Sequence, residues 1–595
     1  MENIEIARLL SETADLMEIA DEDGFRIRSY RNGAGAIESY PERVEDILKD
    51  PARKLTDIAG IGKGLAAVLE EIARRGTFER RDQLLERYPP TALEMLKIQG
   101  LGPKTIRILW EHFRVSTLEE LEQLCKDHKL QELPRMGLKL EEKILRGLSH
   151  YRQSAGRFLL GFATRTAEEL TAYLRETPGV SEVTPAGSLR RGRETVGDLD
   201  LVVTGPGAEA ALERFVQHPR VHEVLGHGAN KASARFGLEG IQVDVRALSD
   251  ESRGAAMQYF TGNKEHNVAL RQRALRMGMT LNEYGLTQLD NGQVVASRTE
   301  HEIYEALGLD WIPPELRENT GEIDAAERHA LPVLVELADI RGDLHMHTRE
   351  SDGRGTLEEM ADAAKALGYG YAAITDHSKA LAMANGLDEK RAVDFAAQVR
   401  EFNKQERGIR LFSGLECDIL RDGRMDLSQD ALCELDYVIA SVHSYMNLES
   451  AEMTDRLMRV FESPSVKVFG HPTGRVLLHR EPYAYDFDRI ASEAARRGVW
   501  MEINASPERL DLNPTLVRRA RSLGVKLVIA TDAHHPKHLA NMRYGVTMAR
   551  RGWLTRDDVM NTKDEAAFAA AIALPRGPDF SLQTGFSRSN NPEQC

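Results

Sequence analysis

Residues 187–204 read GSLRRGRETVGDLDLVVT, and this stretch decides how the centre of the chain folds. Its second half, 198–204, is apolar and β-branched and predicts a strand. Residues two apart on a strand share a face, so Asp198 and Asp200 project together. Residues 240–246 predict a neighbouring strand, on which Asp244 can join them. Three adjacent carboxylates repel one another unless cations are present, and the pattern therefore predicts a divalent-metal site.

The chemistry of such a site is phosphoryl or nucleotidyl transfer. Two divalent ions roughly 4 Å apart activate an attacking oxygen and stabilise a leaving pyrophosphate. Mg²⁺ suits carboxylates combined with substrate phosphates. Ser188 and Arg191 lie in the preceding loop, where they could hold a triphosphate. The alternative is a pair of solvent-facing acids on an edge strand.

Composition sets the frame around this site. The chain has 595 residues, enough for about four domains, and its 42% hydrophobic and 29% charged residues are typical of a globular protein. Its formal net charge of −15 argues against a general nucleic-acid binder, although local basic patches remain open. No apolar run is long enough for a membrane helix, the acidic start is unlike a targeting peptide, and four scattered cysteines are typical of reduced thiols. We expect a cytoplasmic protein.

Residues 1–150 predict a helical region with two glycine turns before helices. Gly60 and Gly62 precede Lys63, and Gly100 and Gly102 precede Lys104. Such helix-hairpin-helix turns expose backbone N–H groups at a helix N-terminus, where a phosphate binds favourably. The alternative is a tight helix–helix turn without a ligand. A further phosphate contact could come from Arg26, Arg28, Tyr30, Arg31 and Lys63, or else these residues form a solvated basic face.

The second half alternates seven apolar runs with helical patterns, which predicts a parallel sheet closed into a βα barrel with seven strands. The runs are 343–346, 371–375, 411–415, 437–442, 466–469, 499–503 and 526–530. Functional residues of such barrels lie at the C-terminal strand ends. Nine candidate metal ligands are found there: His345, His347, Asp352, His377, Glu416, His443, His471, Asp532 and His534. Mixed imidazoles and carboxylates favour Zn²⁺, Mn²⁺ or Fe²⁺ over Mg²⁺.

The first half of the chain, from about residue 3 to 318, resembles the family X DNA polymerases, the DNA polymerase beta type. Gly187-Ser188 with Asp198 and Asp200 is similar to that family's palm signature. The resemblance implies two Mg²⁺ on Asp198, Asp200 and Asp244, and nucleotide contacts from Gly187, Ser188, Arg191, Tyr259, Phe260, Gly262, Asn267 and Arg271. Leu281–Leu286 is similar to the thumb. Val68 stands where eukaryotic relatives carry a Schiff-base lysine, so lyase chemistry by that route is not expected.

The second half resembles the PHP (polymerase and histidinol phosphatase) domain, from about 339 to 575. The resemblance implies that the nine residues bind three divalent metals, Zn²⁺ or Mn²⁺. One metal would use His345, His347, Glu416 and Asp532. A second would share Glu416 and add His443 and His471, and the third would use Asp352, His377 and His534.

These observations predict a multidomain α+β and α/β protein: a helical helix-hairpin-helix N-terminal region, a nucleotidyltransferase palm and thumb, and a C-terminal distorted (βα)7 PHP barrel. The expected boundaries are a helical DNA-end-binding domain at 1–80, a second helix-hairpin-helix subdomain at 81–152, the palm at 153–250, the thumb at 251–318, a linker at 319–338, the barrel at 339–575 and a disordered tail at 576–595.

The expected function is a DNA-directed DNA polymerase that fills short gaps in base-excision-type repair, with a PHP 3′→5′ exonuclease or 3′-end-processing phosphoesterase activity. The expected partners are dNTPs and gapped or nicked DNA with a 5′-phosphate, and we expect a monomer with no membrane partner. One alternative is a non-catalytic DNA-end scaffold, which the intact Asp triad and the nine metal positions disfavour. Another is a small-molecule phosphatase fused to a DNA-binding region, which the motif from Tyr259 to Asn267 disfavours.

Overall fold

The computed structural model describes residues 1, 3–40, 43–50, 53–58, 60–98, 100–133, 136–154 and 156–573. The tail expected at 576–595 lies outside the described residues. By its contacts the chain divides into two compact units. The first comprises Met1–Gly156 with Leu478–Arg480, and the second comprises Arg157–Leu477 with Glu481–Cys595.

The first unit is helical, as the sequence predicted. Its elements are α1 (Asn3–Ile19), α2 (Gly24–Ser39), α3 (Val44–Lys49), η1 (Leu55–Asp57), α4 (Lys63–Arg75), α5 (Glu79–Arg87), α6 (Thr91–Met95), α7 (Pro103–Phe113), α8 (Leu118–Lys126), η2 (Lys129–Glu132) and α9 (Leu138–Ser154). One apolar face of each longer helix enters a common core; α4, for example, buries Leu65, Leu69 and Ile72. The hydrophobic periodicity of the sequence explains this packing.

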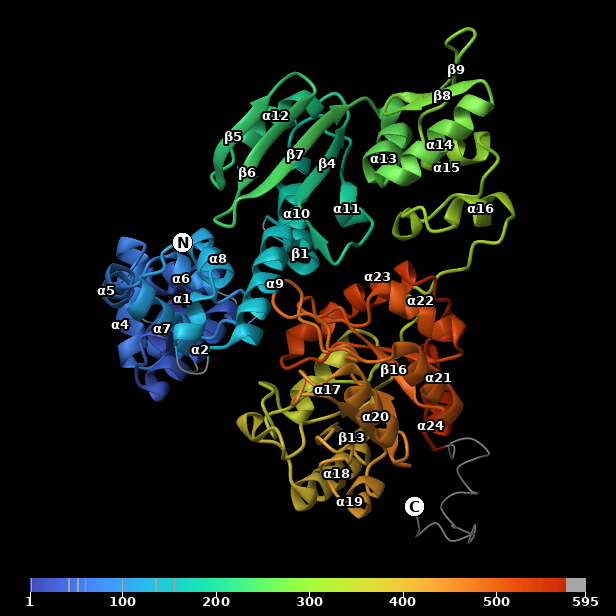
Figure 1. Cartoon of the computed structure of the whole chain (residues 1–595). Helices are drawn as coiled ribbons and strands as arrows, with labels where there is room; N and C mark the ends of the chain where they lie inside the picture. Colours follow the sequence, from blue (N-terminus) through green and yellow to red (C-terminus); the bar gives the residue numbers. More distant parts are fainter. Residues whose placement is uncertain are drawn as a thin grey trace. The chain divides into compact units, whose positions relative to one another are not determined.

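The second unit begins with the palm, a five-stranded sheet in the order β2-β4-β7-β6-β5 (Figure 1). Its elements are β1 (Phe158–Leu159), α10 (Leu160–Arg175), β2 (Glu182–Pro185), α11 (Gly187–Arg190), β3 (Thr195–Val196), β4 (Asp198–Thr204), α12 (Ala208–Val216), β5 (Val221–His227), β6 (Lys231–Phe236) and β7 (Ile241–Leu248). Strands β4 and β7 run parallel and are direct neighbours. The two strands predicted at 198–204 and 240–246 are therefore confirmed.

The thumb follows the palm. It contains η3 (Asp250–Ser252), α13 (Arg253–Thr261), α14 (Lys264–Arg276), the three-stranded sheet of β8 (Met279–Asn282), β9 (Gly285–Gln288) and β10 (Val294–Ala296), then α15 (Glu300–Ala306), η4 (Pro314–Leu316) and α16 (Glu322–Glu327). The segment expected as a linker contains α16. Ala325 and Ala326 of that helix pack in the same hydrophobic cluster as Ile303 and Tyr304 of the thumb.

The barrel has seven parallel strands in sequential order, β11 to β17. Its elements are η5 (Leu337–Asp339), β11 (Gly342–Asp343), α17 (Leu357–Ala366), β12 (Tyr371–Ile374), η6 (Ala382–Ala384), α18 (Glu389–Asn403), β13 (Arg410–Asp418), α19 (Gln429–Cys433), β14 (Tyr437–Ser441), α20 (Ser450–Val460), β15 (Val466–Phe469), α21 (Phe487–Arg497), β16 (Trp500–Asn504), α22 (Pro514–Ser522), β17 (Leu527–Ala530), η7 (Pro536–Asn541), α23 (Met542–Arg551), η8 (Arg556–Asp558), η9 (Met560–Thr562) and α24 (Glu565–Ala573). A bridge between Met346 and Ala533 joins the first and last strand regions. The predicted seven-stranded barrel is confirmed.

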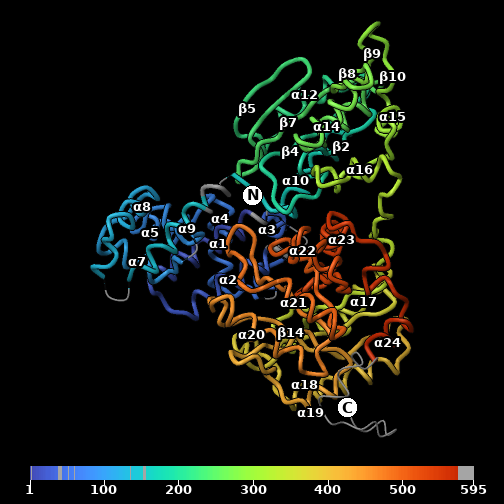
Figure 2. The backbone as a smooth tube through the Cα atoms, turned by 45° about the vertical axis from the view of Figure 1, so that its right-hand side comes forward, coloured from blue at the N-terminus to red at the C-terminus, as the bar shows by residue number. Residues whose placement is uncertain are grey.

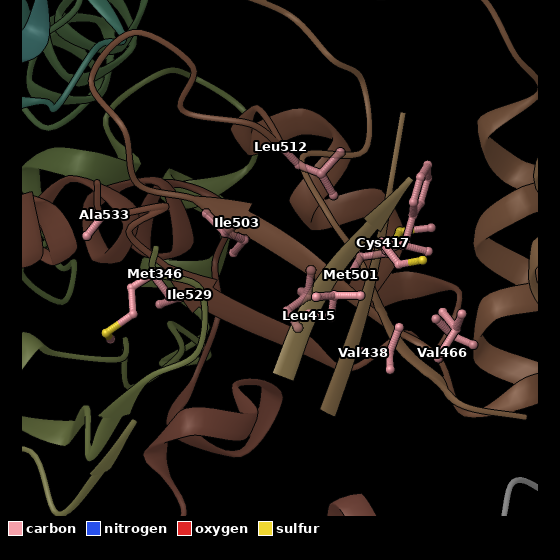
Figure 3. Packing of buried hydrophobic residues seen from close by; sticks show 14 of the residues in the cluster. Met346, Leu415, Cys417, Val438, Val466, Met501, Ile503, Leu512, Ile529 and Ala533 are labelled. Carbon is pink, nitrogen blue, oxygen red and sulfur yellow. The ribbon is translucent and has the colours of Figure 1, made fainter. Parts of the chain in front are cut away.

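Alternate residues of each barrel strand face opposite sides, which separates two cores. Tyr371, Phe412 and Tyr437 pack inside with Phe568 of α24, whose ring stacks on Tyr371 at a centroid distance of 4.7 Å. The other side of the strands packs against the surrounding helices, with α17 on β12, α18 on β13 and α23 on β17. Figure 2 labels these three helices on the yellow-to-red part of the tube. Figure 3 shows this outer layer, in which Leu415, Val438, Met501 and Ile529 belong to one cluster.

The apolar interior explains where the polar residues must lie. Phe412 and Glu416 are four residues apart on β13 and so share the inner face. Phe412 lies in the apolar layer, and Glu416 lies two inward-facing positions nearer the C-terminal end of the strand. No described helix is both long enough and apolar enough to span a lipid bilayer.

Candidate functional site

The barrel gathers all nine predicted ligands at the C-terminal ends of its strands. His345 and His347 were expected on a strand, but β11 ends at Asp343 and both residues follow it. The segment stays extended because Ala533 exchanges backbone hydrogen bonds with it: Ala533 N donates to His345 O at 3.3 Å, and His347 N donates to Ala533 O at 2.9 Å. The two imidazoles therefore still reach the same site.

Glu416 is the centre of the cluster and is 1% exposed. Its carboxylate oxygens lie close to imidazole nitrogens of His471 (2.8 Å), His377 (2.9 Å), His443 (3.2 Å), His345 (3.4 Å) and His347 (3.7 Å). The surrounding histidines hold the pKa of Glu416 well below its usual range although burial opposes them. One carboxylate is thus shared by five imidazoles.

Two further carboxylates complete the set. Asp532 Oδ1 lies 3.2 Å from His347 Nε2 and 3.6 Å from His534 Nδ1. Asp352 lies 3.4 Å from His534 Nε2 and 3.6 Å from His377 Nε2. Three groups have ligand atoms within 4.8 Å of one another: His347, Asp352, His377 and His534; His345, His347 and Asp532; and His377, Glu416 and His443.

The donor atoms fit divalent metals. His345 Nε2, His377 Nδ1 and Glu416 Oε2 are buried and converge without making a hydrogen bond. Leaving buried polar atoms unsatisfied is costly, whereas a metal would satisfy them together. Burial and the neighbouring His534 and His377 lower the pKa of His347 to about 3, so this ring is in the neutral form that a metal requires.

Several buried acids that the sequence reasoning missed orient the ligands. Glu502 accepts from His345 Nδ1 at 2.7 Å and from the backbone N–H of His471. Asp418 contacts His443 Nδ1 at 3.1 Å. Such outer carboxylates fix the tautomer and direction of a ligating ring. Glu502 lies two residues before Asn504, so an acid on the inner face of a strand was the signal that could have revealed it.

Arg509 is a basic group beside this cluster. Its Nε lies 3.7 Å from Asp532 Oδ2, and its Nη1 is buried without a hydrogen-bond partner. An unsatisfied guanidinium N–H next to a metal ligand can donate a hydrogen bond to a phosphoryl oxygen.

The palm brings its three predicted carboxylates together. Asp200 and Asp244 are direct partners in the parallel β4–β7 pairing, and Asp198 is two residues from Asp200 on the same strand face. Burial and the charge of Asp198 raise the pKa of Asp200 to about 6. Asp244 is 6% exposed and forms an ion pair with Lys231 Nζ at 2.6 Å. The mutual repulsion that predicted cations is therefore present.

The loop before β4 approaches these acids closely. Gly187 has φ +60°, and a Cβ there would lie 2.6 Å from Asp200 Oδ2, so only glycine fits. Ser188 follows in α11. Arg191, expected on a triphosphate, donates to Thr261 O at 2.6 Å and to Glu318 Oε1 at 3.1 Å in this structure.

The motif from Tyr259 to Asn267 is held by a side-chain hydrogen bond to its own backbone. Asn267 Nδ2 donates to Tyr259 O at 2.7 Å, and its side chain fills the space that a Cβ on Gly262 would need. The ring of Phe260 lies under the guanidinium of Arg246 at 4.3 Å. Arg271 is exposed on α14.

Both glycine hairpins of the first unit have the same geometry. Ile61 N donates to Ile58 O at 3.0 Å and Leu101 N to Ile98 O at 3.1 Å, with Gly60 at φ +88° and Gly100 at φ +104°. Gly62 and Gly102 are the N-caps of α4 and α7. A Cβ on either would meet no atom within 4 Å, so each helix N-terminus, beside Lys63 or Lys104, is open to an anion.

The basic residues of α2 differ in availability. Arg26 and Arg28 are exposed. Tyr30 is 6% exposed and stacks with Phe78, and Arg31 pairs with Asp15 (3.1 Å) and Glu18 (2.5 Å). A phosphate could therefore reach Arg26 and Arg28 directly, but not the buried ring of Tyr30.

Family comparisons match four parts of the chain. Residues 1–78 match a helix-hairpin-helix domain and residues 92–149 a SAM-like helix-hairpin-helix tandem. Residues 256–318 match the DNA polymerase beta thumb, and residues 343–506 match the PHP domain.

Relatives extend over these parts. Half of the chain (50%) aligns at 24% identity with 53% of a DNA polymerase lambda from Rattus norvegicus. A stretch that makes up 37% of the chain is 26% identical to 89% of a protein named "Probable phosphatase" from Thermoanaerobacter sp. (strain X514). The "DNA polymerase/3′-5′ exonuclease PolX" of Bacillus subtilis (strain 168) is 36% identical over 96% of this chain and 99% of its own length. The chain therefore belongs to the family X DNA polymerases that carry a C-terminal PHP domain.

Proposed function

We propose that this protein is a DNA-directed DNA polymerase that fills short gaps during base-excision-type repair and trims 3′ ends with its barrel as a 3′→5′ exonuclease or phosphoesterase. The observation that carries the proposal is the presence of two complete acid-rich sites in one chain. Asp198, Asp200 and Asp244 form one, and the nine-residue cluster around Glu416 forms the other. The names of the Bacillus subtilis and Rattus norvegicus relatives support the same pair of activities.

In the palm, Asp198, Asp200 and Asp244 would hold two Mg²⁺. Two such ions activate an attacking oxygen and stabilise a leaving pyrophosphate. Asp244 lies beside Asp200 and would face the primer 3′-hydroxyl. Gly187 has no side chain, so the backbone at this position lies close to Asp200, and a triphosphate could bind next to both. Ser188 and Arg191 bind that triphosphate once Arg191 leaves Glu318. Tyr259, Phe260, Asn267 and Arg271 position the incoming nucleotide and the template.

In the barrel, the nine residues would hold three divalent metals, Zn²⁺ or Mn²⁺. Together such metals supply a hydrolytic nucleophile and neutralise phosphoryl charge. The chain's own part is to orient the ligands through Glu502 and Asp418, and to bind a non-bridging phosphate oxygen with Arg509. Glu416, which lies among five imidazoles, would be a ligand shared between these metals.

The helical unit would bind the DNA. Lys63 and Lys104 stand beside the open N-termini of α4 and α7, where backbone N–H groups can bind strand phosphates. Arg26 and Arg28 add charge for a 5′-phosphate at the far side of a gap. Val68 packs partly against the hydrophobic core and has no amine, so a Schiff-base lyase step is not part of the proposal. We propose that the protein acts as a monomer on nicked or gapped DNA.

The test uses a 5′-labelled primer on a gapped duplex, with and without dNTPs. The parent should extend the primer with dNTPs and shorten it without them. Asp244→Ala should lose extension alone, and Glu416→Ala should lose shortening alone. Release of phosphate from histidinol phosphate, measured beside these reactions, tests the barrel as a small-molecule phosphatase. A parent protein that releases phosphate but neither extends nor shortens DNA would overturn the proposal.

A further inference from the structure

Two loops at the mouth of the barrel present an aromatic ring beside the metal-ligand cluster. Tyr445 lies two residues after the ligand His443, so their Cα atoms are at most about 7 Å apart. Tyr445 is 52% exposed, whereas the nearby ligands His377, Glu416 and His471 are buried. The ring is therefore open to solvent on the loop that follows a candidate metal ligand.

The backbone of this loop is held in a conformation that bulky residues avoid. Tyr445 has φ +53°, in the left-handed region that favours glycine. Non-glycine residues in that region cluster at functional sites, because the surrounding structure has to hold them there. The holding group is identifiable here.

Arg456 of α20 is that group. It is 2% exposed, and its guanidinium donates to carbonyls of two loops. It reaches Ser444 O at 3.0 Å and Tyr445 O at 3.5 Å on one loop, and Leu420 O at 2.9 Å and Ile419 O on the other. One buried cation therefore fixes the loop after β14, on which His443 lies, to the loop that follows β13, the strand of Glu416.

The second loop places a cation against the ring. The guanidinium of Arg421 lies 5.6 Å from the centroid of the Tyr445 ring and is 64% exposed. It also faces Glu452 at 3.6 Å, a long and solvent-exposed ion pair that costs little to exchange. An exposed aromatic face with an adjacent guanidinium is the combination on which single-stranded nucleic acids stack their bases.

We propose that Tyr445 and Arg421 form a nucleobase subsite: a base near the 3′ end of a single strand stacks on the Tyr445 ring while its scissile phosphate lies at the metal-ligand cluster. The inference rests on the proposed nuclease function of the barrel and names the part of the substrate that this face recognises. Stacking is tolerant of sequence because every base has a π face, so the subsite grips any 3′ end. Arg421 adds attraction for the polyanionic strand.

The first test is a double-mutant cycle between the ring and the base. One partner is Tyr445→Ala. The other is a 5′-labelled oligonucleotide whose three 3′-terminal nucleotides are abasic tetrahydrofuran units. Parent protein should cleave the ordinary end with a kcat/KM about 10-fold higher than the abasic end, mainly through KM. Tyr445→Ala should lose this preference and cleave both ends alike, whereas Tyr445→Trp should retain it.

The matched control is Leu367→Ala. Leu367 is 48% exposed and follows α17 near the start of β12, at the opposite rim of the same barrel. It should leave both rates unchanged. If Tyr445→Ala lowers both rates by the same factor, the ring is structural and the subsite is refuted. If Tyr445→Ala changes neither rate, the base binds elsewhere and the subsite is refuted as well.

The second measurement does not require hydrolysis, so it separates failure of the subsite from failure of the proposed nuclease. An oligonucleotide with 2-aminopurine at its 3′ end is bound in EDTA. Stacking on an aromatic ring quenches this base, so parent protein should quench it more strongly than Tyr445→Ala at saturation. Equal quenching by the two proteins overturns the subsite. Quenching that depends on Tyr445 in a protein that cleaves no DNA would retain the subsite and refute the nuclease.

Discussion

The palm and the barrel both use carboxylates to gather cations, but they prepare their sites differently. In the palm, Asp198 is exposed, and Asp244 is neutralised by a lysine from the next strand. In the barrel, His345, His347 and Glu416 are at most 1% exposed and contact one another. Under the proposed function, the palm site would be completed by metal and nucleotide together, whereas the buried barrel site would keep its metals.

The difference follows from ligand number and type. Three carboxylates leave coordination positions for water and substrate phosphates, which suits weakly held Mg²⁺. Nine ligands, six of them imidazoles, favour transition metals with higher affinity. We therefore expect the proposed nuclease to keep its metals and the proposed polymerase to exchange them.

The largest expected effect comes from replacing one carboxylate in each site, which should remove one activity and leave the other. Glu416→Gln removes the charge that five imidazoles surround and should lower DNA hydrolysis on the order of 10³-fold, since a metal cluster contributes several kcal/mol to the transition state. Nucleotide addition should stay within 2-fold or so of the parent. Asp200→Asn should instead lower nucleotide addition and leave DNA hydrolysis close to that of the parent. Both activities are measured on the same 5′-labelled gapped duplex.

The control for this swap is Asp250→Asn, which changes an exposed acid near the palm and should alter neither activity. If Glu416→Gln abolished extension as well, the two sites would not be independent, and the contrast between them would fail.

Much of this contrast could be predicted from the sequence. The palm strand at 198–204 and the seven barrel runs were readable because β-branched periodicity and helix alternation are local signals. The ligands at the strand ends followed from topology, since parallel strands place their C-terminal ends together. The third palm carboxylate, Asp244, was also predicted, because its strand pattern is regular.

The outer contacts were not predictable in the same way. Glu502, Asp418 and Lys231 act through neighbours distant in sequence, and only the folded register brings Lys231 to Asp244. The burial of the Tyr30 ring against Phe78 was not predictable either, because an amphipathic helix shows its periodicity without showing which aromatic ring the partner helices cover. His345 and His347 lie beyond β11 because bridges to Ala533, rather than a long strand, hold them extended.

The next prediction tests how the barrel retains its metals. Glu502→Gln should lower metal affinity about 10- to 100-fold, because it weakens the contacts that orient His345 and His471. Metal per protein is measured by elemental analysis after gel filtration, without reference to activity. Glu508→Gln, an exposed acid six residues further on, is the matched control and should keep the parental content. Full metal content in Glu502→Gln would show that the nine ligands suffice without orientation.

A smaller effect is expected at Arg509. Its unsatisfied buried N–H should bind a phosphoryl oxygen, so Arg509→Ala should reduce kcat/KM for DNA hydrolysis about 10-fold, the contribution of one charge-assisted hydrogen bond. Arg509→Lys should restore part of this, and metal content and nucleotide addition should remain parental. The control is Arg518→Ala on α22, which removes an arginine that donates to Thr320 O away from the cluster. A loss of metal from Arg509→Ala would instead make Arg509 a support for Asp532.

The smallest expected effect concerns pH and the metal-free palm. The pKa of Asp200 is raised to about 6 by burial and by Asp198, above about 4 for an unfolded aspartate. A carboxyl group whose pKa is raised by folding contributes stability that is complete below pH 4 and is lost as the pH rises through 6. In EDTA at pH 7.5, Asp200→Asn should therefore protect the β4 and β7 amides from hydrogen exchange more than the parent does, by on the order of 1 kcal/mol after solvent screening. The gain should shrink at pH 4.5, where the parental carboxyl is protonated. It should also shrink with Mg²⁺, which stabilises only the parental carboxylates. Equal protection of variant and parent at both pH values would mean that Lys231 and Arg246 already neutralise the palm. Its carboxylates would then not destabilise the fold in the absence of metal.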